Sequence, residues 1–251
     1  LSGAVVIVGG TFTASTGTVE WNAAGGQILA LLTYNNLTLA GTSAKTFPAG
    51  TTNVTGVLSM EGTATATLTG SIAYGASATL EYKGSGSQTT GAEFPSTFGG
   101  SGGVIIDNAS GVNLGGSAAI NYGLMLTSGA FSVGANILTL NGPTIGGTPA
   151  NLSTTSSSSL LFGGSSSGVN LPSSVSALNN LTLNNANGIT LNSSPSISGS
   201  LILTSGIITT GSNTLNLATG ASISGGGAAT YVNGNLRKGF NTGAGQSFTF
   251  P

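Results

Sequence analysis

The chain contains no cysteine and no histidine, and only nine of its 251 residues are charged. Without these two residue types there are no disulfides, and zinc, copper and haem sites lose their usual ligands. A histidine general base and a Ser-His-Asp triad are excluded for the same reason. We therefore expect no cofactor, no metal and no enzymatic activity.

Charge is the second scarce property. Charged residues make up 4% of the chain and the net charge is −1, whereas an average protein carries ~25% charged residues. A protein that binds nucleic acid needs clustered Lys and Arg to neutralise phosphates, so no nucleic-acid partner is expected. No apolar run approaches the ~18 residues of a membrane span, so no membrane span is expected either.

What is abundant is glycine, with 43 residues, and short apolar segments in alternation. The region 178–217 shows this most clearly. It contains pairs of leucines two residues apart, such as Leu181 with Leu183 and Leu201 with Leu203, flanked by Asn, Ser, Thr and Gly. Apolar residues at a period of two predict β-strands, and the Asn/Gly/Ser clusters between them predict turns. No segment has the spacing of an amphipathic helix.

The chain also contains a long internal repeat. The segment 104–114 (VIIDNASGVNL) aligns with 181–191 (LTLNNANGITL), an offset of 181 − 104 = 77 residues, and 124–129 aligns with 201–206 at the same offset. Long repeats begin near residues 19, 80 and 160, and the first is shortened. We expect residues 1–230 to form one repeat domain, and 231–251 to form a terminal rung, a cap or a join to a further β-domain.

Strands that return at a regular interval predict an all-β, right-handed parallel β-helix, or β-solenoid, of about twelve rungs of ~20 residues and a length on the order of 60 Å. Asn108 with Asn185, and Asn136 with Asn213, are expected to form side-chain ladders at the turns. The alternative is an antiparallel β-sandwich with Asn-Gly hairpins. The positions expected to face inward are Leu37, Leu39, Val104, Ile106, Leu124, Leu126, Leu138, Leu140, Leu181, Leu183, Ile189, Leu191, Leu201, Leu203, Leu215 and Leu217.

Four segments carry a resemblance to a known group of proteins. They are 34–41 (YNNLTLAG), 80–98 (LEYKGSGSQTTGAEFPSTF), 178–192 (LNNLTLNNANGITLN) and 232–251 (VNGNLRKGFNTGAGQSFTFP). They resemble the repeat regions of large secreted surface proteins and adhesins of the Bacteroidota type, many of which leave the cell by type IX secretion. The resemblance implies an extracellular or cell-surface location, and a segment of a longer chain.

These observations predict a non-enzymatic structural or adhesive rod in a surface fibre, stalk or filament. Its expected partner is itself, because the open strand edges at the ends of a coil favour end-to-end stacking or strand donation. The residues expected to make these assembly contacts are Ser247, Phe248, Thr249, Phe250, Arg237 and Lys238.

Two alternatives remain open. In a carbohydrate-binding or carbohydrate-active β-helix, Glu20 beside Trp21 and Glu81 beside Tyr82 would form acid–aromatic platforms for surface glycans, although both pairs also recur simply because the repeat recurs. Glu61 and Glu93 stand alone in the sequence. In an ice-binding solenoid, the threonine rows at 11–13, 63–67 and 209–210 would form a flat array.

Overall fold

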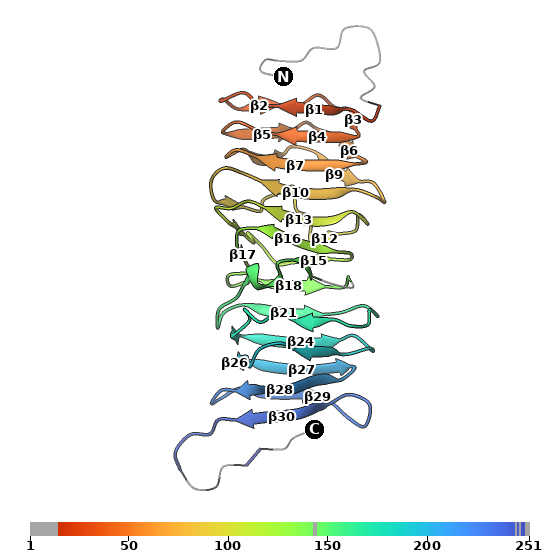
Figure 1. Cartoon of the computed structure of the whole chain (residues 1–251). Coiled ribbons are helices and arrows are strands. Elements are labelled where there is room, and N and C mark those ends of the chain that lie inside the picture. The colour runs from red at the N-terminus through yellow and green to blue at the C-terminus, as the bar shows by residue number, and fades with distance from the viewer. Residues whose placement is uncertain (1–14, 143–144, 244, 246, 249–251) are drawn as a thin grey trace.

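The computed structural model describes residues 15–142, 145–243, 245 and 247–248. Strands of successive turns pair in parallel and stack into a β-solenoid of about ten turns, with about 21 residues between equivalent strands (Figure 1). The predicted fold class is therefore confirmed and the sandwich is excluded. The handedness of the coil stays a prediction.

The expected number of about twelve rungs is wrong. The described strands begin at Thr18 and end at Lys238, so the segments at both ends of the chain add no described turn. Each turn also takes slightly more residues than expected, as the pairing of Leu37 with Leu58 shows. Ten turns at a strand spacing of ~4.8 Å give a coil about 50 Å long.

From β1 to β27 each turn contributes three strands, one to each of three faces. The first face is a seven-stranded sheet, here called the long first sheet. Its strands in order are β1 (Thr18–Trp21), β4 (Asn36–Leu39), β7 (Val57–Glu61), β10 (Thr79–Lys83), β13 (Gly103–Asp107), β16 (Leu124–Ser128) and β19 (Ile145–Gly147).

The second face consists of two shorter sheets. One holds β2 (Gln27–Ile28), β5 (Ala44–Phe47) and β8 (Thr65–Leu68). The other holds β11 (Gln88–Thr89), β14 (Val112–Asn113), β17 (Phe131–Ser132) and β20 (Leu152–Ser153).

The third face begins as a three-stranded sheet and continues as a seven-stranded one, here called the continuous sheet. The first holds β3 (Thr33–Tyr34), β6 (Thr51–Val54) and β9 (Ser71–Tyr74). The continuous sheet holds β12 (Thr97–Phe98), β15 (Ala118–Ile120), β18 (Ile137–Leu140), β21 (Ser159–Phe162), β24 (Asn180–Asn184), β27 (Ser200–Ser205) and β29 (Ser222–Gly225).

A last sheet closes the C-terminal turns. It contains β22 (Asn170–Leu171), β23 (Ala177–Leu178), β25 (Ile189–Leu191), β26 (Ser196–Ile197), β28 (Ile208–Leu217) and β30 (Val232–Lys238). The long strand β28 pairs with β25 near its start and with β26 near its end, so it turns a corner within one strand. β30 pairs with β28 and forms the last described turn.

The core is a single apolar column along the axis. All sixteen positions predicted to face inward are buried. Because these neighbouring strands pair without a shift in register, equivalent leucines stack on one another along the axis. Leu37 is in register with Leu58, and Leu58 with Leu80. Because burying a leucine side chain is worth about 1.5–3 kcal/mol, this column is the main source of stability.

The 77-residue repeat does not span a whole number of turns. β13 and its sequence equivalent β24 are eleven strands apart (24 − 13 = 11). With three strands to a turn, eleven strands make three and two-thirds turns. The repeated segment therefore lies in the long first sheet in one copy and in the continuous sheet in the next.

This rotation makes the expected asparagine ladders wrong, since equivalent residues face different directions. Each asparagine instead bonds to the backbone of the turn before it. The side-chain Nδ2 of Asn136 donates to the Leu114 carbonyl at 2.6 Å. Asn213 donates to the equivalent Leu191 carbonyl at 2.8 Å.

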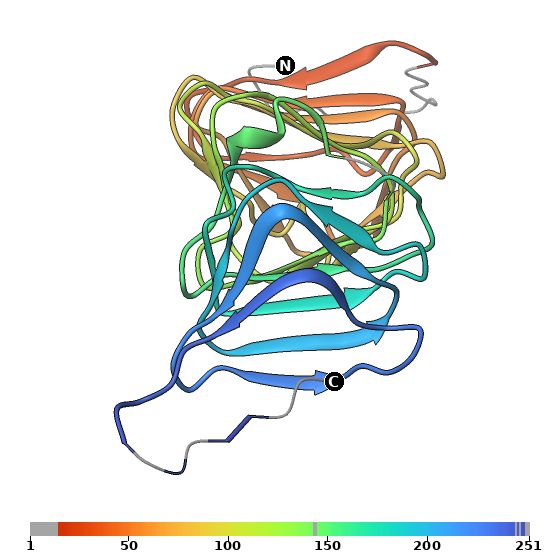
Figure 2. The ribbon, with the colours of Figure 1, turned by 60° about the horizontal axis from the view of Figure 1, so that its bottom comes forward.

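At one place along the axis, two of the three faces are interrupted together. The long first sheet ends at β19, its neighbour on the second face ends at β20, and the last sheet begins with β22. Only the continuous sheet crosses, through β18, β21 and β24. A 3-10 turn, η1 (Pro149–Asn151), lies on one side of the interruption (Figure 2). We call this place the junction.

Candidate functional site

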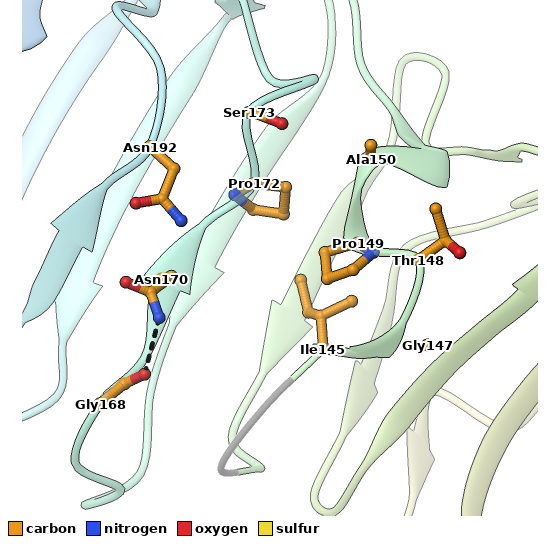
Figure 3. A pocket seen from close by; sticks show the side chains of 10 residues that line it. All are labelled: Ile145, Gly147, Thr148, Pro149, Ala150, Gly168, Asn170, Pro172, Ser173 and Asn192. Atoms are coloured by element: carbon orange, nitrogen blue, oxygen red, sulfur yellow. Dashed lines mark hydrogen bonds between the residues drawn. The ribbon is translucent and has the colours of Figure 1, made fainter.

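The junction contains a surface crevice of about 400 Å³. We call it the junction crevice. Ile145, Thr148 and Pro149 line one side of it, and Asn170, Pro172 and Asn192 line the other (Figure 3). Its volume is within the ~300–1,000 Å³ typical of small-molecule sites.

The crevice is uncharged, and its lining combines apolar surface with a few polar groups. Its lining contains no acidic and no basic residue, and its polar groups are the amides of Asn170 and Asn192 with the hydroxyls of Thr148 and Ser173. The Asn170 Nδ2 donates to the Gly168 carbonyl at 3.0 Å, which fixes the amide. Such a lining can hold a ligand by hydrogen bonds but supplies no acid, base or nucleophile activated by a charge.

A second polar site is fully buried. The Glu93 side chain is 1% exposed. Its Oε1 accepts hydrogen bonds from the Tyr82 hydroxyl at 2.8 Å and from the Gly91 N–H at 2.7 Å. The Tyr74 hydroxyl donates to the Glu93 carbonyl at 2.5 Å. Glu93 stands alone in the sequence, but in the fold it is not isolated. It is the acceptor at the centre of a tyrosine network.

Three tyrosine hydroxyls are held protonated by their surroundings. Burial, followed by the Glu93 charge, raises the pKa of Tyr74 and of Tyr82 well above the usual value. Burial raises the pKa of Tyr34 to about 12. These groups lie inside the coil, so they stabilise it and do not form a reactive site.

A steep loss of stability in alkali is expected from these tyrosines. The unfolded chain releases phenol protons at pH ~10, whereas the folded chain keeps them, at about 1.4 kcal/mol per tyrosine for each pH unit. The stabilisation from these tyrosines is therefore fully present below pH ~10, and it is lost as the pH rises towards their raised pKa values in the folded chain. Unfolding in guanidinium at pH 8, 10 and 11, followed by circular dichroism, measures this loss.

Lys45 opposes this trend. Burial lowers the pKa of Lys45 below its ordinary value of 10.5. The folded chain therefore gives up this proton more readily than the unfolded chain, and the free energy of unfolding rises as the pH rises between the two pKa values. In a Lys45→Met variant, the gain in stability that Lys45 provides with rising pH is expected to disappear. The loss of stability due to the tyrosines is expected to remain. Stability that did not change between pH 8 and 11 in either protein would contradict the buried tyrosine network.

Lys45 itself is an inward-facing lysine without an acidic partner. It is 0% exposed, and its Nζ donates to the carbonyls of Ala23 at 2.6 Å, Thr42 at 3.1 Å and Gly25 at 3.2 Å. Three carbonyl acceptors satisfy the three N–H donors of an ammonium group. This lysine stabilises a corner between two turns.

The proposed aromatic platforms for glycans do not exist on the surface. Trp21 and Tyr82 are each 1% exposed and belong to the core, because each stands two residues after an inward Val19 or Leu80. Their acidic neighbours face outward in one column: Glu20 pairs with Thr38, Thr38 with Ser59, and Ser59 with Glu81.

Glu20 and Glu81 do not have the spacing of a glycosidase pair. Glu20 and Glu81 are three strand steps apart, about 14 Å at ~4.8 Å per strand, and paired carboxylates need ~5–9.5 Å. Ser59 Oγ lies 3.0 Å from Glu61 Oε1 and 3.0 Å from Glu81 Oε2. Among the described residues, no group of three or more His, Cys, Asp or Glu side chains is placed to hold a metal ion.

The expected assembly residues lie at the C-terminal end. Arg237 is in β30 in register with Asn216, and the Lys238 Nζ donates to the Ala218 carbonyl at 2.7 Å. The same Nζ lies 5.4 Å from the Phe248 ring centre and 5.9 Å from that of Phe240. Ser247 and Phe248 are not in a strand, and Thr249 and Phe250 lie outside the described residues.

The threonine rows are short. Thr46 and Thr67 are in register, with their hydroxyl oxygens 2.7 Å apart, but the next residue of this column is Ile28. Thr209 is in register with Thr190, and the next residue is Asn170. Each array covers two turns, and the residues 11–13 lie outside the described part of the chain.

Comparison with protein-family models, with curated proteins and with solved structures gives no match. In the part of the chain that the structure describes, no helix has the length and apolar character needed to cross a membrane.

Proposed function

We propose that this protein is a non-enzymatic, extracellular structural element: a stiff shaft segment of a surface fibre, stalk or adhesin. The observation that carries the proposal is one apolar column that runs through about ten turns, beside which the seven strands of the continuous sheet stack without interruption. Each turn is hydrogen-bonded to its neighbours along the axis, so bending the shaft requires breaking many bonds at once. The resemblance to secreted Bacteroidota-type surface proteins supports the extracellular location.

The surface chemistry supports the same function. With nine charged residues in the whole chain, few ion pairs are available to be weakened by changes in salt or pH. An antibody against this chain is expected to label intact source cells without permeabilisation. Labelling that appears only after permeabilisation would contradict a surface location.

End-to-end assembly follows from the open edge of the last strand. β30 pairs only with β28, so its other edge is free among the described strands. Electron microscopy at increasing protein concentration is expected to show filaments with an axial repeat near the length of the coil, about 50 Å for ten turns. Single particles at every concentration would exclude self-assembly while leaving the shaft function intact.

A further inference from the structure

We propose that the junction crevice binds a neutral oligosaccharide. This function goes beyond that of a shaft, and its site differs from the acid–aromatic pairs that the sequence suggested. Three observations carry it: the crevice recurs in the repeat, its second copy gains amide groups, and its edges reject a peptide strand.

A crevice occurs at the same place in the preceding copy of the repeat. Residues 77 positions before Gly168 and Asn192 are Gly91 and Gly115, and both of these line a cavity of about 190 Å³. The two cavities therefore share two equivalent positions of the repeat. The junction crevice, at about 400 Å³, is the larger of the two, and residues on the far side of the junction complete it.

The two copies differ in the residues that fill them. In the first copy the position of Asn170 is occupied by Glu93. Its side chain faces inward, and its Oε1 accepts hydrogen bonds from the Tyr82 hydroxyl and the Gly91 N–H. In the second copy Asn170 is exposed and lines the cavity. Gly115 is replaced by Asn192, so the second copy carries two amides where the first carries none.

The chemistry of the lining fits a sugar without charge. Each amide offers two N–H donors and a carbonyl acceptor, which match the paired donor and acceptor character of sugar hydroxyls. Ile145, Pro149 and Pro172 add apolar surface on which the C–H face of a pyranose ring can pack. The absence of any basic group in the lining disfavours uronic and sulfated sugars, whose charge would be left unpaired.

The edges of the crevice also argue against a peptide that adds as a strand. Pro149 follows β19 and Pro172 follows β22, and a proline offers no N–H to a new strand. The η1 turn carries the chain away from the extended conformation on one side. The side-chain hydrogen bond from Ser174 to the Leu152 carbonyl, at 2.6 Å, ties the two sides together and limits how far they can separate.

The test is titration of the whole chain with cellohexaose, mannohexaose and laminarihexaose, followed by saturation-transfer NMR and calorimetry. At least one of the three is expected to bind saturably. Asn192→Gly, which copies the first crevice, and Asn170→Ala are each expected to weaken that binding at least tenfold. Asn235→Ala, an exposed asparagine on β30, is the matched control and is expected to bind like the parent.

Three outcomes would overturn the proposal. They are no saturable binding of any of the three sugars, equal binding by Asn192→Gly at unchanged melting temperature, and tighter binding of oligogalacturonate than of the neutral sugars. None of them bears on the shaft function, which is tested by microscopy and surface labelling.

Discussion

Replacing Gly206 by alanine is expected to destabilise the C-terminal turns by about 3 kcal/mol or more. Gly206 has φ +94°, and a Cβ there would lie 1.9 Å from the Asn185 carbonyl oxygen of the preceding turn. That carbonyl accepts a hydrogen bond from the Gly188 N–H at 2.8 Å, so moving it away from the added Cβ would break this bond. Hydrogen exchange over residues 185–206 measures the loss.

A matched control separates the clash from the backbone conformation. Gly220 has a similar φ of +84°, but a Cβ added there would meet nothing within 4 Å, so Gly220→Ala is expected to cost only about 1 kcal/mol. A Cβ added at Gly129, the repeat equivalent of Gly206, would likewise clash with the carbonyl oxygen of Asn108 in the preceding turn. Equal effects of the substitutions at Gly206 and Gly220 would show that contact between turns is not what requires glycine.

The Glu93→Ala substitution is expected to cost about 3–5 kcal/mol, because it leaves the buried Tyr82 hydroxyl and the Gly91 N–H without their acceptor and opens a cavity. Glu93→Gln keeps an acceptor and is expected to cost clearly less. Both variants are expected to let Tyr82 ionise at lower pH than in the parent, since the Glu93 charge helps to raise its pKa. Absorbance of the phenolate during an alkaline titration follows this change.

A double-mutant cycle with Tyr82→Phe isolates the hydrogen bond between the two side chains. The two substitutions are expected to be non-additive by about 1–3 kcal/mol. Additive costs would mean that Glu93 stabilises the coil through the Gly91 N–H alone. Tyr122→Phe is a suitable control, because Tyr122 is exposed and far in sequence from this network.

Sequence alternation was sufficient to predict the fold and the core. In a solenoid every strand has one face on the same apolar column, so the period of two carries over from strand to strand without exception at the sixteen inward positions. The same rule places Trp21 and Tyr82 inside, since Val19 and Leu80 are inward. An acidic residue directly beside Trp21 or Tyr82 in the sequence has the opposite parity, so the two side chains of each predicted glycan platform lie on opposite faces of the strand.

Contacts between turns were harder to predict. Glu93 and Tyr82 are eleven residues apart and meet only because two corners bring them together inside the coil. The junction contains a Gly/Ser-rich segment, 163–169, whose composition is like that of ordinary turns elsewhere in the chain. The rotation of the repeat depends on how many residues each corner uses, and no local pattern reports that number.

The advance of three and two-thirds turns per repeat has a consequence for how the molecule meets its surroundings. Successive copies of one sequence element are offset by a third of a circle, so the smaller crevice and the junction crevice open in different directions around the axis. Three full-length repeats would therefore place equivalent positions of the repeat on three sides of the coil. In the proposed shaft, a target that approached from any side would meet one copy of this position, and the residues of that copy would decide whether it binds.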